Sequence, residues 1–86
     1  MNIILYVDFK SVKINNDFKL ANALTREHTV LLVTNEIQLN ASYGSYDIIV
    51  VGQSAEGFKC ALNKRILYLQ ECWDLQESII QIEKEY

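Results

Sequence analysis

Four stretches of the chain are apolar over the length of a β-strand, and more polar segments separate them. Their sequences are NIILYVDF, TVLLVTN, YDIIVVG and KRILYLQ, at residues 2–9, 29–35, 46–52 and 64–70. Apolar runs of this length that are rich in β-branched and aromatic residues favour strands. Because the runs are continuous and do not alternate with polar positions, we predict parallel strands that are buried on both faces.

Apolar residues at helical spacing follow the first predicted strand. They predict a helix over about residues 17–27, whose N-terminus Asn15 or Asn16 would cap. The residues at this spacing are Phe18, Leu20, Ala21 and Leu24. The segment EIQLNASYGS, residues 36–45, is rich in Asn, Ser and Gly. We therefore expect it to be a connection with at most one helical turn.

Two more helices are predicted, one after the third strand and one after the fourth. The stretch SAEGFKCALN predicts a short helix that begins at Ser54. The stretch DLQESIIQIEKEY predicts a helix that begins at Asp74, with Glu77 three positions later in a capping box. The residues expected to face inward are Phe58, Ala61 and Leu62 in the first of these helices and Leu75, Ile79 and Ile82 in the second.

This alternation of elements predicts one α/β domain over residues 1–86. Right-handed crossovers place helices on both faces of a parallel sheet. We therefore expect a three-layer, flavodoxin-like or Rossmann-like fold with four parallel strands in the order 2-1-3-4. The side chains expected to be buried on the strands are Ile4, Tyr6, Leu32, Ile49, Val51 and Leu67.

This strand order places the topological switch between strands 1 and 3. Ligands of open α/β sheets bind there, outside the carboxyl ends of the strands. We therefore place the candidate ligand-binding residues at this edge, and they are Asp8, Lys10, Lys13, Gly52, Gln53, Ser54, Glu71 and Trp73.

The stretch GQSAEG places Gly52 at the end of the third strand and Ser54 at a helix N-terminus. Amides left unpaired at such a terminus attract anions, so the amides from Gly52 to Ala55 should respond first to an anion. The stretch matches neither G-x-G-x-x-G nor G-x-x-x-x-G-K-[ST]. Gly52 therefore either makes a tight turn or helps to bind a phosphate weakly, and Lys10 and Lys13 either supply charge to that phosphate or are solvated.

Asp8 ends the first strand, where a carboxylate can serve as a metal ligand, a general base or a ribose contact. It is a single carboxylate without a paired acid or base, so we assign no catalytic residue and no metal ligand. Trp73 either packs the last helix against the sheet or forms the wall of a pocket or interface, and in the second case Cys72 is accessible too. His28 lies at the opposite edge, and we interpret it as a helix-end residue.

Composition and charge exclude several classes of function. The net charge of −3 and the pI of 5.0 argue against a nucleic-acid-binding protein. The apolar runs are far shorter than the roughly 20 residues of a membrane span, and MNIILYVDFK lacks the features of a signal peptide. Cys60 and Cys72 form no Cys-x-x-Cys motif, so we expect reduced thiols, no cofactor and a cytoplasmic protein.

The stretches LANALTREHTVLLVTN and YDIIVVGQSAEGFKCALNKRILYLQECWD resemble the N-terminal half of GT-B fold glycosyltransferases. In that family a helix of the type LA.AL...H leads into a VxLVT strand, and a YDII strand and a K.I.Y strand follow. The resemblance covers roughly residues 1–75. It implies an N-terminal-type Rossmann-like domain whose enzymatic partner is a second domain. This chain has DFKSVKIN where the family commonly has a glycine-rich loop, so no catalytic residue is transferred.

Two hypotheses about function follow from the sequence. In the first, the chain is a binding module without catalysis of its own, which works through a protein partner or as the N-terminal-type domain of a larger glycosyltransferase-like protein. In the second, it is a nucleotide-binding or nucleotide-sugar-binding domain that uses the switch point. An exposed apolar patch favours the first hypothesis, and a polar crevice at the switch point favours the second.

Overall fold

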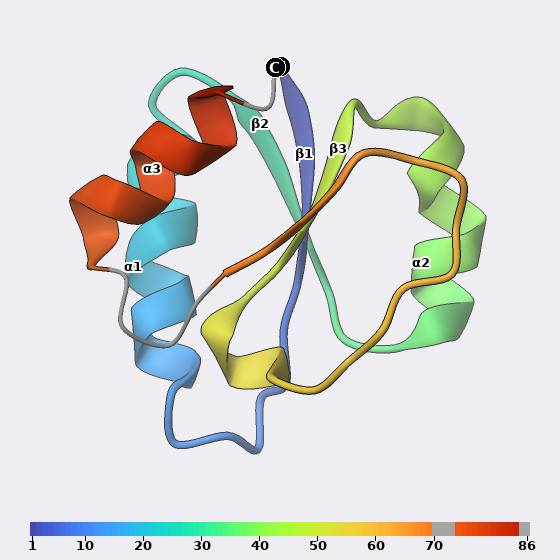
Figure 1. The fold of residues 1–86 in the computed structure, drawn as a ribbon, viewed down its shortest axis with the longest axis horizontal. Helices are drawn as coiled ribbons and strands as arrows, with labels where there is room; N and C mark the ends of the chain where they lie inside the picture. The colour runs from blue at the N-terminus through green and yellow to red at the C-terminus, as the bar shows by residue number, and fades with distance from the viewer. Residues whose placement is uncertain (70–73, 85–86) are drawn as a thin grey trace.

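The computed structural model describes residues 1–69 and 74–84 of the chain. Its strands and helices alternate along the sequence (Figure 1). The elements are β1 (Asn2–Tyr6), α1 (Ile14–Leu24), β2 (Thr29–Val33), α2 (Glu36–Ser42), β3 (Ile48–Val51), β4 (Ile66–Tyr68) and α3 (Leu75–Lys84). Two 3₁₀ turns, Tyr43–Ser45 and Gln53–Ala55, flank β3. No helix among the described residues is long and apolar enough to cross a membrane.

The strands form one parallel sheet in the order β2-β1-β3-β4, which confirms the predicted fold class and strand order. Ile4 on β1 pairs with Leu31 on β2 and with Ile49 on β3, and Ile49 pairs with Ile66 on β4. Helices α1 and α3 lie on one side of the sheet and α2 lies on the other (Figure 1). The switch in chain direction therefore falls between β1 and β3, as expected.

The two faces of β1 and β3 carry the core, because these central strands are covered on both sides. The side facing α1 and α3 buries Ile3, Leu5, Val7, Leu20, Ala21, Leu24, Ile48, Val50 and Ile82. The side facing α2 buries Ile4, Tyr6, Val33, Leu39, Ile49, Val51 and Ala55. Of the predicted buried residues, Leu32 and Leu67 are only partly buried. They lie on β2 and β4, the edge strands, which have a neighbouring strand on one side only.

Helix α1 begins and ends three residues earlier than predicted. Neither Asn15 nor Asn16 caps it, because both lie inside its first turn. Turns that precede the helix direct the chain into it instead: the amide of Ser11 donates to the carbonyl of Asp8, and the amide of Ile14 donates to the carbonyl of Ser11. The helix therefore starts without a side-chain cap.

Two of the remaining predictions about helices are wrong. The expected connection 36–45 contains α2, because the side chain of Asn35 caps it by accepting from the amide of Gln38 at 2.9 Å and Leu39 is buried under it. The expected helix from Ser54 is only the 3₁₀ turn Gln53–Ala55 followed by irregular chain. Glu56 leaves the helical region with a ψ of 132°, and Gly57 follows with a φ of 92°, so the chain does not continue as a helix.

Helix α3 begins as predicted. Oδ1 of Asp74 accepts a hydrogen bond from the amide of Glu77 at 2.8 Å. Ile82 is fully buried and Ile79 is partly buried, whereas Leu75 is 38% exposed. The predicted apolar stripe therefore packs mainly along the later turns of the helix.

Candidate binding site at the carboxyl edge

A crevice opens at the switch point, outside the carboxyl ends of β1 and β3. The turn after β3 and the segment after β1 form its two sides, and the end of β2 contributes Thr34. The residues that line it are Tyr6, Val7, Asp8, Lys10, Thr34, Ser54, Ala55, Glu56 and Phe58. This is the position at which open α/β sheets bind their ligands.

An aromatic pair lines one wall of the crevice. The rings of Tyr6 and Phe58 are stacked, with 4.0 Å between their centroids and 9° between their planes. Burial raises the pKa of the Tyr6 phenol, and the negative charges of Glu36 and Asp8 raise it further. The phenol is therefore neutral at pH 7 and can donate a hydrogen bond.

Asp8 shapes the segment that follows β1. Its Oδ1 accepts from the amide of Lys10 at 2.9 Å, which makes a tight turn. Its own amide donates to the hydroxyl oxygen of Ser54 at 2.9 Å. Among the described residues, its second carboxylate oxygen has no hydrogen-bond partner. Asp8 therefore has a structural role through one oxygen and leaves the other available to a ligand.

Ser54 and Lys10 supply donors to the same crevice. The Ser54 hydroxyl accepts a hydrogen bond from Asp8, so its proton can still be donated. The ammonium group of Lys10 has no ion-pair partner within the described part of the chain. Lys13 differs, because its Nζ lies 2.9 Å from a carboxylate oxygen of Glu56.

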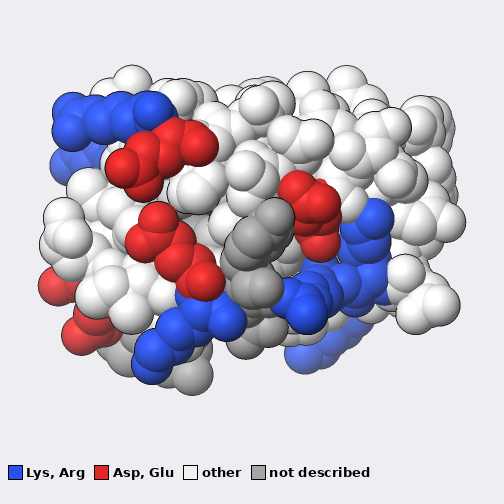
Figure 2. Space-filling model, turned by 90° about the horizontal axis from the view of Figure 1, so that it is seen from above, with Lys and Arg blue, Asp and Glu red and all other residues white. Residues whose placement is uncertain are grey.

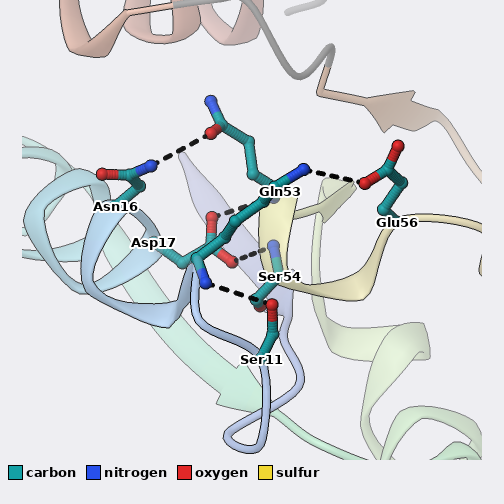
Figure 3. A network of polar contacts seen from close by, with 7 residues as sticks. Ser11, Asn16, Asp17, Gln53, Ser54 and Glu56 are labelled. Carbon is teal, nitrogen blue, oxygen red and sulfur yellow. Dashed lines mark hydrogen bonds and ion pairs between the residues drawn. The ribbon is translucent and has the colours of Figure 1, made fainter.

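A buried carboxylate from α1, that of Asp17, contacts the turn after β3 (Figure 3). The side chain of Asp17 is 1% exposed, and its two oxygens accept from the amides of Gln53 and Ser54, each at 2.9 Å. The Gly52 amide donates to Tyr6, and the Ala55 amide donates to Gly52. The expectation that these four amides are unpaired is therefore wrong, because Asp17, the end of β1 and the turn itself supply their acceptors.

Gly52 is required by the same carboxylate. A Cβ built on Gly52 would lie 2.5 Å from Oδ2 of Asp17, closer than real Cβ atoms approach another heavy atom. The backbone of Gly52 has φ −70° and ψ 166°, so its conformation is open to any residue. Gly52 is present because of this close approach.

The structure brings together some of the predicted site residues and separates others. Asp8, Lys10 and Ser54 line the crevice together. Lys13 and Gln53 are not among the lining residues: Lys13 pairs with Glu56. The side chain of Gln53 accepts from Asn16 (Figure 3). Gly52 is buried and is not among the lining residues. Glu71 and Trp73, together with Cys72, lie outside the described residues.

Sequence reasoning missed several residues of the site. Asp17, Thr34, Glu56 and Phe58 were not predicted there, and Tyr6 was predicted only as part of the core. Nothing in the local sequence connects Asp17 with residues 36 and 37 positions later. An acidic residue in the first turn of a helix is a common feature, and its contact with the turn after β3 depends on the tertiary fold.

His28 lies at the opposite, amino-terminal edge of the sheet. Its amide donates to the carbonyl of Leu24 at 2.9 Å, as expected of a residue at a helix end. Its Nε2 lies 3.4 Å from a carboxylate oxygen of Glu83, and ligand-type atoms of Glu27, His28 and Glu83 lie within 4.8 Å of one another. Figure 2 looks onto this edge and shows acidic and basic side chains interspersed on it.

Comparisons with protein-family models, with curated proteins and with solved structures gave no match for this chain. The geometry of the crevice is therefore the main indication of function.

Proposed function

We propose that this chain is a small binding module without catalysis of its own, and that its ligand binds in the switch-point crevice. One observation carries the proposal. A carboxylate oxygen of Asp8, the hydroxyl proton of Ser54 and the ammonium of Lys10 are without partners among the described residues, and all three groups line one crevice. Polar groups that converge beside an apolar wall are typical of a small-molecule site.

The chemistry of these groups favours a ligand that carries hydroxyl groups, such as a nucleoside or a sugar. Carboxylate oxygens of Asp8 and Glu56 accept from hydroxyl groups, and Lys10 and Ser54 donate to them. Tyr6 and Phe58 line the crevice and give the ring of such a ligand an aromatic, largely apolar wall. This narrows the nucleotide or nucleotide-sugar hypothesis of the sequence to the nucleoside or sugar part of such a ligand.

The absence of catalysis is part of the proposal. An upward shift moves the pKa of Tyr6 away from neutrality, which makes its phenol a poor general base at pH 7. One oxygen of Asp8 is used by the turn. These observations support binding and orientation of a ligand, and they supply no paired acid and base.

A second candidate function is contact with a protein partner or a second domain, as in the larger glycosyltransferase-like protein that the resemblance implies. The observation that favours it is a group of exposed apolar side chains near the same edge: Phe9 is 55% exposed, Val12 is 95% exposed and Phe18 is 41% exposed. The rings of Phe9 and Phe18 lie 5.9 Å apart. The segment between β1 and α1 that carries Phe9 and Val12 protrudes from the molecule (Figure 1).

Saturation-transfer NMR with the purified chain tests the first proposal. Uridine, adenosine and glucose are offered separately, and we expect at least one nucleoside or sugar to receive saturation. Lys10→Gln and Ser54→Ala should each weaken that signal, since each removes one donor from the crevice. Lys84→Gln, at the end of α3, makes the same charge change away from the crevice and should leave the signal unchanged.

Two outcomes would contradict the first proposal. If no nucleoside or sugar receives saturation, or if Lys84→Gln weakens the signal as much as Lys10→Gln, the crevice is not the site. If the chain then associates and Phe9→Ser and Val12→Ser abolish that association, the second candidate function is supported.

A further inference from the structure

We infer that Asp17 is a built-in anion that occupies the phosphate position at this edge, so that the crevice selects ligands without a phosphate. We name the backbone N–H groups of Gln53 and Ser54 the amide cradle. The part of the inference that concerns ligand choice rests on the proposed function. The part that concerns the amide cradle does not depend on it.

The geometry of the amide cradle is that of a bound anion. Two successive N–H groups at the end of a central strand point at one carboxylate, and both distances are 2.9 Å. Charge-assisted hydrogen bonds from backbone N–H groups to an oxyanion have this length. In other α/β proteins, the N–H groups at such a turn bind phosphate. Here the oxyanion belongs to the first turn of α1.

Three features keep a phosphate out of the amide cradle. The carboxylate of Asp17 uses both N–H groups. It also occupies the adjoining space so fully that Gly52 has no room for a Cβ. Its negative charge repels a second anion. Because Asp17 is part of the chain, its effective concentration at the amide cradle greatly exceeds that of a dissolved phosphate.

The amide cradle is linked to the crevice through Ser54. The amide of Ser54 is fixed by Asp17, and its hydroxyl oxygen is fixed by the amide of Asp8. Asp17 is thus a positioning residue for Ser54, and it connects α1 with the carboxyl ends of β3 and β1 (Figure 3). A ligand in the crevice meets a hydroxyl that is already oriented, but no phosphate-binding amides.

Amide chemical-shift titrations of the wild-type chain and of Asp17→Ala test this inference, with formate and with inorganic phosphate as probes and chloride at equal ionic strength as reference. In Asp17→Ala, formate should shift the Gln53 and Ser54 amides saturably and raise the thermal midpoint. Formate should bind Asp17→Ala about tenfold or more tightly than it binds the wild-type chain, because its hydrogen bonds to the amide cradle involve a charged group.

Two further variants separate the amide cradle from general effects of charge and structure. Asp74→Asn removes a charge at the same edge and retains a good helix cap, so it should not respond to formate. Asp17→Asn removes the charge but keeps the side-chain volume, so formate should not rescue it. A merely structural role for Asp17 predicts that Asp17→Ala and Asp17→Asn respond alike to added anions.

Saturable movement of the wild-type Gln53 and Ser54 amides with phosphate would overturn the inference, and so would a folded Asp17→Ala that ignores formate. If Asp17→Ala is unfolded in every anion, the wild-type phosphate titration decides alone. Failure of the proposed function has a different signature: no nucleoside or sugar binds, while formate still shifts Asp17→Ala.

Discussion

Gly52 and Asp17 show how one close contact determines the residue type at a site. Because a Cβ on Gly52 would overlap the Asp17 carboxylate, Gly52→Ala must move α1 or break the bonds to the amide cradle. We expect a loss of about 2 kcal/mol or more in the free energy of unfolding. Gly44→Ala is the matched control, since a Cβ there meets nothing within 4 Å. Equal denaturation midpoints for the two variants would contradict this account of Gly52.

The Tyr6 phenol gives a pH-dependent prediction. Its pKa is raised in the folded chain, so the unfolded chain releases this proton at lower pH than the folded chain does. Below the unfolded-state pKa of about 10, Tyr6 therefore adds no pH dependence to the free energy of unfolding. As the pH rises from about 10 through the folded-state pKa, ionisation of Tyr6 lowers the free energy of unfolding. Thermal midpoints between pH 8 and pH 11 should fall less for Tyr6→Phe than for the wild-type chain. Parallel curves for the two proteins would show that the phenol is not perturbed.

At the residue scale, sequence reasoning located the switch point but not the partners of its residues. Asp8, Lys10 and Ser54 follow strand ends, which the apolar pattern reveals. The buried state of Asp17 could not be predicted in this way, because a carboxylate in a first helical turn is normally solvated. Only its contact with the turn after β3 explains its burial.

At the scale of elements, α2 shows the limits of composition as a guide. Asn, Ser and Gly favoured a connection, whereas Asn35 caps a helix of seven residues and Leu39 anchors it to the sheet. One buried residue and one cap outweighed weak helix propensity. The segment after Ser54 shows the opposite case: a helix was expected, but Glu56 leaves the helical region and Gly57 adopts a positive φ.

The cap of α2 can be tested directly. Asn35→Ala removes the acceptor for the Gln38 amide and should lower the free energy of unfolding by about 1 kcal/mol. Asn35→Asp keeps an acceptor at the same place and should be nearly neutral. Chemical denaturation of both variants measures the difference. A neutral Asn35→Ala would mean that the helix does not depend on its cap.

At the scale of the whole molecule, the continuous apolar runs were sufficient to predict the sheet and its order. They did not predict how deeply each strand is buried, because burial also depends on how many neighbours a strand has in the sheet and on the helices that cover it. Ile49 on β3 is fully buried, whereas Leu32 on β2 is partly buried. The strand order together with the covering helices explains this difference.

This difference between strands predicts unequal costs of truncation. Ile49→Ala should lower the free energy of unfolding by about 2 to 5 kcal/mol, as for a fully buried aliphatic residue. Leu32→Ala should cost less, about 1 to 2 kcal/mol, because part of its surface is exposed in the folded chain. Urea denaturation of both variants gives the comparison. A larger loss for Leu32→Ala would contradict the assignment of β2 to the edge.

The central claim is that the carboxyl edge is the binding edge of this molecule, and a map of amide chemical shifts tests it most directly. The wild-type chain is titrated with the nucleoside or sugar that gives the strongest saturation transfer. The account predicts saturable shifts at Asp8, Lys10 and Glu56, around the crevice, and unmoved amides near His28 at the opposite edge. Shifts that gather around His28 and Glu83 while the crevice stays unchanged would contradict it.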